Sequence, residues 1–274
     1  MMRSTRVYDS AARLAPLVEE LQALFRYRDL IFQLVARSVK VRYKRSILGV
    51  AWTMMNPLLT MGVLTLVFSK LFNFNSSDYA LYVLSGLLIW NLFAQSTTAA
   101  MGDLIWSGGL LGRVFVPKTV FAISALGTGL VNFILALGAY VLIAWIIGTK
   151  IPLTVFLLPI PIFLVSLFTL GVGLVLSTAA IYFPDTVPMY EVFLTAWLYL
   201  TPVIYPVELL PQGLQRILQF NPLYPLLTTF RAVLVEGQLP DGSSLLISSI
   251  TALGMLSLGW WIFTRRAREY AYRL

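Results

Sequence analysis

The residues best placed to do chemistry are cations that recur at helical spacing just before the first long apolar segment. Intervals of three and four residues put such groups on one face of a helix, and apolar residues fill another face here. Guanidinium and ammonium groups bind phosphate oxygens, so the polar face suits anionic lipid headgroups. The polar positions are Arg26, Asp29, Gln33, Arg37, Lys40 and Lys44, and the apolar positions are Tyr27, Ile31, Leu34, Val35 and Val39.

This pattern predicts an interface helix, which lies in the headgroup layer of a membrane with its apolar face inward. The alternative is an ordinary surface helix packed on a soluble domain, and the sequence that follows argues against it. The residues expected to contact headgroups are Arg37, Lys40, Arg42, Tyr43, Lys44 and Arg45.

Few residues of this chain could act in catalysis, because it contains neither cysteine nor histidine. Disulfides, thiolate nucleophiles, imidazole bases and Cys/His metal sites are therefore excluded. The G-x-x-x-x-G-K-[ST] loop that cradles nucleotide phosphates is also missing from the sequence. We expect a chain that is not an enzyme and that binds no metal, cofactor or ATP of its own.

The elements that position the basic helix must lie in a membrane. The 274 residues are 58% hydrophobic with a mean hydropathy of +0.81, whereas soluble domains are typically ~45–50% apolar. Charged residues make up 12% and concentrate near the two ends, so the net charge of +8 belongs to those ends. This distribution indicates contact with anionic lipids and a topology signal, not nucleic acid.

Six apolar segments are about long enough for the ~20 residues that a spanning helix needs. We expect an all-α integral membrane fold, with residues 1–47 as a cytoplasmic segment carrying the interface helix, 48–264 as the membrane domain and 265–274 as a basic tail. The predicted spans are Leu48–Leu71, Tyr79–Met101, Thr119–Gly148, Leu153–Phe183, Val187–Tyr205 and Ser244–Phe263.

An even number of spans puts both termini on one side of the membrane. If that side is cytoplasmic, sixteen basic residues lie inside and four lie outside. Because basic residues accumulate in cytoplasmic loops, the termini are predicted to be cytoplasmic. The four outer basic residues are then Lys70, Lys150, Arg216 and Arg231.

Two connections are too elaborate to be simple links. The cytoplasmic segment GDLIWSGGLLGRVFVPKTV mixes apolar residues with Arg113 and Lys118, which predicts a short helix against the membrane or a partner. The outer segment after the fifth span is apolar yet divided by five prolines, from Pro202 to Pro225. Such pieces predict short re-entrant helices, which need burial in protein or a cavity to line.

At these positions the chain resembles the membrane subunits of ABC-2 type exporters, especially permeases for lipid-linked polysaccharides such as O antigen, capsule and teichoic acid. The resemblance runs from about Phe25 to the end of the chain. It rests on three motifs in order: RYKRSILGVAWTMMNP at Arg42–Pro57, GLLGRVFVPK at Gly109–Lys118, and TPVIYPVELLP with NPLYP at Thr201–Pro211 and Asn221–Pro225.

The resemblance implies a permease in the bacterial inner membrane, paired with a second copy of itself and driven by two ATP-binding-cassette subunits. ATP and Mg would be bound by those partner subunits, and the substrate would be a lipid-linked glycan. The GLLGRVFVPK motif would be the coupling segment that docks the ATPase. Its candidate coupling residues are Leu110, Leu111, Arg113, Val114, Phe115, Val116, Pro117 and Lys118.

Aromatic side chains are candidates for a glycan pathway, because sugar rings stack on aromatic faces. The alternative for each is helix packing or a membrane-interface belt. Trp52 would border a gate open to the membrane beside the interface helix, and Tyr205 and Tyr224 would lie near the outer exit. The full candidate set is Trp52, Trp90, Phe93, Trp197, Tyr199, Tyr205 and Tyr224.

Two other functions stay open at this point. One is an ABC-2 exporter of a small hydrophobic molecule or drug. The other, more distant, is a membrane glycosyl- or acyltransferase, which would need an acid/base or metal constellation that the sequence does not supply.

A small-residue face in the fourth span, formed by Gly171, Gly173 and Ser177, predicts close contact with another helix.

Overall fold

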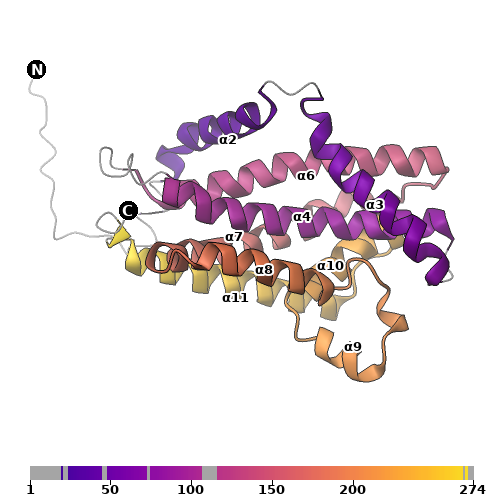
Figure 1. Cartoon of the computed structure of the whole chain (residues 1–274). Coiled ribbons are helices and arrows are strands. Elements are labelled where there is room, and N and C mark those ends of the chain that lie inside the picture. Colours follow the sequence, from indigo (N-terminus) through magenta and orange to yellow (C-terminus); the bar gives the residue numbers. More distant parts are fainter. Residues whose placement is uncertain are drawn as a thin grey trace, which may run out of the picture.

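The computed structural model describes residues 20, 24–44, 48–72, 75–106, 116–267 and 269–270. In this part of the chain the regular structure is helical, and the long helices form one bundle (Figure 1). The first elements are α2 (Arg28–Tyr43), α3 (Ala51–Leu71), α4 (Ser76–Trp106), α6 (Thr119–Ile147) and the 3₁₀ turn η1 (Leu153–Leu157). The later ones are α7 (Pro159–Tyr182), α8 (Thr186–Tyr199), η2 (Val207–Leu209), α9 (Gln212–Leu218), α10 (Leu223–Arg231), the π turn η3 (Ala232–Glu236) and α11 (Gly242–Arg266).

Five of the described helices are long and apolar enough to cross a membrane, namely α3, α4, α6, α7 and α11. They coincide with five of the six predicted spans. The expected span 153–183 begins as the η1 turn, and α7 starts at Pro159, whose ring fixes φ for a first helical position. Helix α6 ends at Gly148, which adopts a φ of +83° as a left-handed cap.

The bundle has two ends, which we name after the helices near them. The α2 end holds the start of α6 and the ends of α7 and α11, where the Tyr182 hydroxyl donates to Glu269. The α9 end holds the start of α4 and the connection before α7, where the Thr154 hydroxyl donates to the Val233 carbonyl at 2.7 Å. The segment between α7 and η3 therefore connects the α2 end of the bundle to the α9 end.

Helix α8 (Thr186–Tyr199) covers most of the distance between the two ends, although its 14 residues are fewer than a typical membrane-spanning helix has. Near its start, the Tyr190 hydroxyl lies 2.8 Å from the Thr97 hydroxyl of α4. Beyond its end, the Ile204 carbonyl accepts from the Tyr79 hydroxyl, also of α4, at 2.8 Å. From Tyr79 to Thr97, α4 rises roughly 27 Å at ~1.5 Å per residue, so α8 and the turns after it follow α4 over nearly that length.

Helix α4 is the centre of the bundle and is buried along most of its length, whereas α3 lies almost entirely at the surface. The backbones of α7 and α11 approach one another closely. A Cβ on Gly171 would lie 2.5 Å from backbone atoms of Met255, and one on Gly259 would lie 2.2 Å from the Gly171 carbonyl oxygen. Of the predicted small-residue face, Gly171 is therefore in close contact with α11, whereas a Cβ on Gly173 would lie 3.3 Å from Ala100 of α4, so the two glycines face different helices.

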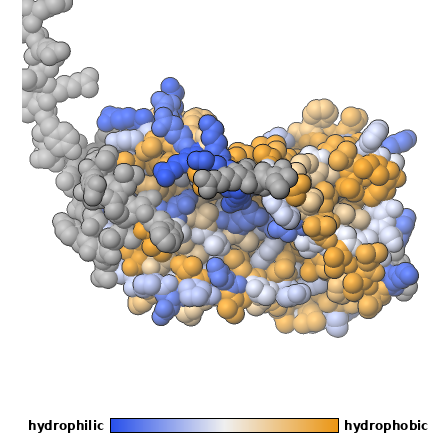
Figure 2. Space-filling view, turned by 45° about the horizontal axis from the view of Figure 1, so that its top comes forward, coloured by the Kyte–Doolittle hydropathy of each residue, from blue (hydrophilic) through white to orange (hydrophobic). Residues whose placement is uncertain are grey.

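The amphipathic pattern of α2 is confirmed. Its five predicted apolar residues are half-buried, and α2 packs on α6, where the Val35 side chain lies against Gly127. The six predicted polar residues are all exposed. Figure 2 shows hydrophilic side chains gathered over α2 and the adjoining centre of this face, with hydrophobic residues dominating the half away from α2.

Short helices do occur between α8 and α11, as the prolines predicted. Helix α9 is largely exposed, but α10 is buried within the bundle. Consequently Arg231, counted above among outer basic residues, is only 5% exposed and lies inside the protein. The order of the predicted spans placed Arg231 in the connection between the fifth and the sixth span, and the burial of α10 removes its side chain from the exposed surface of that connection.

Arg231 is satisfied by neutral oxygens from α4 and from the turns after α8. Its guanidinium also stacks 3.7 Å from the centroid of the Tyr82 ring. The guanidinium donates to the Ser85 hydroxyl at 3.2 Å, the Tyr82 hydroxyl at 2.8 Å, and the carbonyls of Tyr82 at 3.2 Å, Pro202 at 2.6 Å and Val203 at 2.8 Å. We call this group the Arg231 clamp, since it ties α10 to α4 and to the chain that follows α8.

Candidate functional site

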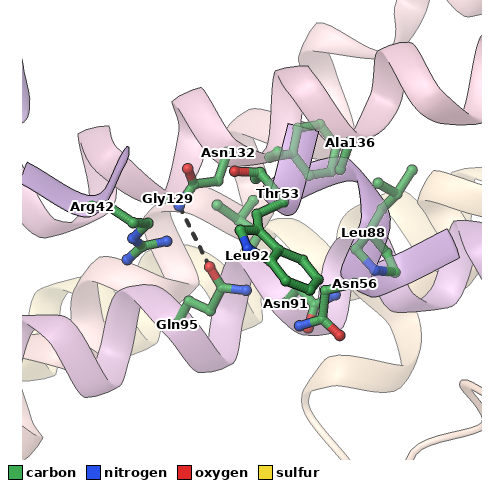
Figure 3. Close-up of a pocket in the computed structure, with 13 residues that line it drawn as sticks. Arg42, Thr53, Asn56, Leu88, Asn91, Leu92, Gln95, Gly129, Asn132 and Ala136 are labelled. Atoms are coloured by element: carbon green, nitrogen blue, oxygen red, sulfur yellow. Dashed lines mark hydrogen bonds between the residues drawn. The ribbon is translucent and has the colours of Figure 1, made fainter. Parts of the chain in front are cut away.

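A cavity of about 260 Å³ opens between α3, α4 and α6 (Figure 3). Its walls combine amide side chains with apolar groups, and a cation and an indole complete the lining. The polar lining residues are Arg42, Thr53, Asn56, Asn91, Gln95 and Asn132, and the apolar ones are Trp52, Pro57, Leu88, Leu92, Gly129, Phe133 and Ala136.

Helical spacing brings the amides together. Asn91 and Gln95 are four residues apart on α4, so both point from one face, and Asn132 faces them from α6. The Asn132 amide donates to the Gln95 side-chain oxygen at 3.5 Å, a long bond (Figure 3). Gly129 lets α6 approach α4, because a Cβ there would lie 1.9 Å from the Ser96 hydroxyl.

The charged residue that lines the cavity, Arg42, lies on the α2 side. Arg42 is exposed at the end of α2, and its charge also acts on the Asp103 carboxyl of α4. Trp52, in the first turn of α3, is 51% exposed and lines the same cavity. A guanidinium, an indole and several amides can together hold phosphate, an apolar sugar face and hydroxyl groups.

Of the residues that line the cavity, Arg42 and Trp52 were predicted from the sequence and the amides were not. Their signal was available: Asn56, Asn91, Gln95 and Asn132 are amides inside segments that are otherwise apolar. Polar groups at that depth are costly unless they find partners or line a cavity. The sequence could not show that Gln95 and Asn132, which are 37 positions apart, face one another.

The other aromatic candidates lie apart from this cavity. Trp90 and Phe93 are buried, and Phe93 packs edge-on against Trp197 with centroids 5.1 Å apart. The Trp197 indole donates to the Asn221 side-chain oxygen at 3.0 Å. The structure thus packs Trp90, Phe93 and Trp197 together within the bundle, whereas Trp52 lines the cavity.

The candidates toward the α9 end are more accessible. Tyr199 is 62% exposed, and the Tyr205 hydroxyl donates to the Tyr199 carbonyl at 2.7 Å. Tyr224 is half-buried on α10. Their place near the exit of a pathway stays a prediction.

Part of the predicted coupling segment falls outside the described residues, namely Leu110, Leu111, Arg113, Val114 and Phe115, as does Arg45 of the interface helix. Of the remainder, Val116 is buried and Pro117 and Lys118 are half-buried. Val116 therefore packs within the chain's own fold.

Lys118 connects the coupling segment to the residues after α11. Its ammonium donates to the Ala267 carbonyl and lies 5.2 Å from the centroid of the Tyr270 ring. The Tyr270 hydroxyl in turn lies 2.7 Å from the Thr178 hydroxyl of α7. Burial lowers the pKa of Lys118, and burial raises the pKa of Glu20, while the opposite charges of the two groups counteract both shifts.

Among the residues that the structure describes, no three carboxylates gather closely enough to hold an ion. The fold is that of a helical membrane protein, with five described helices long and apolar enough to cross a membrane and with amide groups that face a cavity between three of them.

The family follows from comparison with known proteins. The ABC-2 type transporter family matches residues 29–235, about three quarters of the sequence. The chain belongs to this family of membrane-domain transport proteins.

Several relatives match nearly the whole chain. The O-antigen export system permease protein RfbA of Myxococcus xanthus is 30% identical over 257 residues, which cover 93% of this chain and 99% of that protein. A protein of the same name from Klebsiella pneumoniae is 25% identical, covering 89% and 94%. The capsule polysaccharide export inner-membrane protein CtrC of Neisseria meningitidis is 25% identical, covering 77% and 81%.

Proposed function

We propose that this chain is the permease subunit of an ATP-driven exporter that moves a lipid-linked polysaccharide across the bacterial inner membrane. The observation that carries the proposal is the 30% identity with an O-antigen export permease over 93% of this chain, including its basic helix and its outer short helices. Two further relatives are named for O-antigen and capsule export, which supports a glycan as the common substrate class.

Energy must come from another protein, because the sequence has no loop for nucleotide phosphates. We propose a dimer of this chain with two ATPase subunits, which would hold ATP and Mg. The ATPase would dock on the segment from Asp103 to Lys118. The contact of Lys118 with Ala267 supports this, since it gives the segment a fixed attachment to α7 and α11 through Tyr270.

The proposed topology has six crossings with both termini in the cytoplasm. The path of α8 along α4 supports a crossing there in spite of its 14 residues. The α2 end would be cytoplasmic, because it carries the basic face of α2 together with Lys118, Arg265 and Arg266. Removing Arg231 from the outer loops leaves Lys70, Lys150 and Arg216 there, so the asymmetry becomes stronger.

Single cysteines in this naturally cysteine-free chain should report the topology. Asp185, between α7 and α8, should be labelled from the cytoplasm, and Gln212, on α9, from the periplasm, because α8 would separate them by a membrane crossing. Both residues are exposed, so accessibility is not limited by packing. A membrane-impermeant maleimide on intact cells measures the outer site, and the same reagent after permeabilisation measures the inner one. Labelling of both sites in intact cells would contradict the proposed crossing at α8.

Deletion of the gene tests the function itself. Surface glycan should disappear and lipid-linked glycan should accumulate inside, because synthesis continues while export stops. The intact chain should restore surface glycan only with an ATPase that hydrolyses ATP. Lectin or antibody staining of whole cells measures the surface glycan, and lipid extraction measures the intermediate. Unchanged surface glycan in the deletion strain would contradict polysaccharide export.

A further inference from the structure

We propose that the cavity between α3, α4 and α6 is a binding site for the phosphate-linked sugar at the lipid end of the exported glycan. The inference rests on the proposed function, and it adds a site and named residues to it. The ligand chemistry is a phosphate for Arg42, hydroxyl groups for the amides, and an apolar sugar face for Trp52.

The amides are the first argument. A membrane helix gains nothing from an amide that faces hydrocarbon, because the polar group loses its water partners. Yet the cavity collects amides from three different helices, including Asn56 of α3, Asn91 of α4 and Asn132 of α6. Asn132 is 6% exposed, so it is held inside the bundle beside the cavity. Amides carry both donors and acceptors, as a sugar hydroxyl requires.

The position of the cavity is the second argument. It begins beside Arg42 and Trp52, where the basic interface helix meets the first spanning helix. On α6 its lining runs from Gly129 to Ala136, which lie roughly 15 and 25 Å from the start of α6 at ~1.5 Å per residue. The cavity thus joins the headgroup level to the interior of the proposed membrane, as a lipid with a polar head would need.

Size decides which part of the substrate fits. Ligand pockets usually measure ~300–1,000 Å³, so 260 Å³ suits one headgroup-sized unit and not a length of polymer. The neighbouring surface of α3 is apolar, with Leu59, Val63 and Leu66 more than half exposed. A lipid chain can therefore lie along α3 while its phosphate and first sugar occupy the cavity.

Binding to the permease–ATPase complex in phosphatidylcholine nanodiscs tests the site. The probe is a radiolabelled polyprenyl diphosphate that carries one N-acetylhexosamine. The double variant N91L/Q95L should weaken probe binding roughly tenfold or more, because hydrogen bonds to the ligand are lost with little change in side-chain volume. R42Q should also weaken binding, whereas R28Q, the same change at the exposed first residue of α2, should not. Q219L, on an exposed residue after α9, is the control for amide removal.

Competition with unlabelled lipids distinguishes a site for the phosphate of the glycan's lipid carrier from a site for the phosphate of an ordinary anionic lipid. Unlabelled polyprenyl diphosphate without sugar should displace the probe more weakly than the glycosylated lipid, and phosphatidylglycerol should displace it hardly at all. Displacement by phosphatidylglycerol as strong as by the glycolipid would overturn the proposal, since the cavity would then be a site for bulk anionic lipid. Unchanged probe affinity in N91L/Q95L would overturn it as well.

Two measurements keep the result interpretable. If N91L/Q95L does not assemble, N56L gives the same test from an exposed rim residue that the packing does not require. Surface glycan in cells separates this proposal from the general function. Normal probe binding and normal export in the cavity variants, with export lost on gene deletion, would overturn the cavity assignment and leave the exporter function standing.

Discussion

Replacing Arg231 with methionine is expected to lower the midpoint of thermal unfolding by roughly 5–10 °C, equivalent to about 2–3 kcal/mol. The guanidinium donates to the carbonyls of Pro202 and Val203 inside the protein, and methionine would leave both without this donor. A buried acceptor without a partner costs about 1–3 kcal/mol, and release of the desolvated charge offsets part of that loss. The measurement is a melting curve of the purified protein in detergent.

Two further variants test whether the loss of stability in Arg231→Met comes from the hydrogen bonds of the guanidinium. Arg231→Lys keeps the charge but not the planar fork of donors, so it should recover only part of the stability. Arg216→Met, on an exposed position of α9, should leave the melting point within about 1 °C, since surface substitutions change stability little. A melting point for Arg231→Met equal to that of the unaltered chain would show that the Arg231 clamp does not stabilise the fold.

Gly86 provides an independent check of the same clamp. A Cβ at this position would lie 2.6 Å from an Arg231 guanidinium nitrogen and 2.8 Å from the Val203 carbonyl oxygen. Gly86→Ala should therefore also be destabilising, although alanine is ordinarily favoured over glycine in a helix.

Replacing Gly171 with alanine is expected to destabilise the protein by about 2–3 kcal/mol, because it forces α7 and α11 apart. The added methyl group would lie 2.5–2.6 Å from backbone atoms of Met255 and Leu256. A helix backbone cannot relieve such a clash by changing rotamer, as a side chain can. Gly259→Ala should have the same consequence from the other helix, since its Cβ would approach the Gly171 carbonyl at 2.2 Å. Melting curves in detergent measure both effects.

The matched control is Gly254→Ala on α11, where nothing lies within 4 Å of the added carbon. This change should be neutral or stabilising by up to ~1 kcal/mol, as expected for alanine in place of glycine in a helix. Equal melting points for Gly171→Ala and Gly254→Ala would mean that α7 and α11 are not in close contact in the membrane protein.

Much of the fold follows from local patterns in the sequence. The apolar segments predicted α3, α4, α6, α7 and α11, and the spacing of charges predicted which side of α2 is exposed. The short helices after α8 were expected from the prolines. These features depend on residues close together in the chain, where hydrophobicity and helical periodicity act directly.

The site was predicted only in part. Arg42 and Trp52 stood out because of their neighbours in sequence, and both line the cavity. The aromatic candidates Trp90, Phe93 and Trp197 were grouped by residue type, and that type serves packing as well as binding. The amides were missed because each is a single polar residue in an apolar segment.

By itself, the sequence determined that this is a membrane protein, which five segments are long and apolar enough to cross a membrane, and that the given sequence contains no nucleotide-binding loop. The tertiary structure decided that α10 and Arg231 are buried, that Gly171 meets α11, and that amides from α3, α4 and α6 face one cavity. The physical reason is the range of the forces involved. Burial in lipid depends on local composition, whereas hydrogen bonds and close packing depend on which distant surfaces meet.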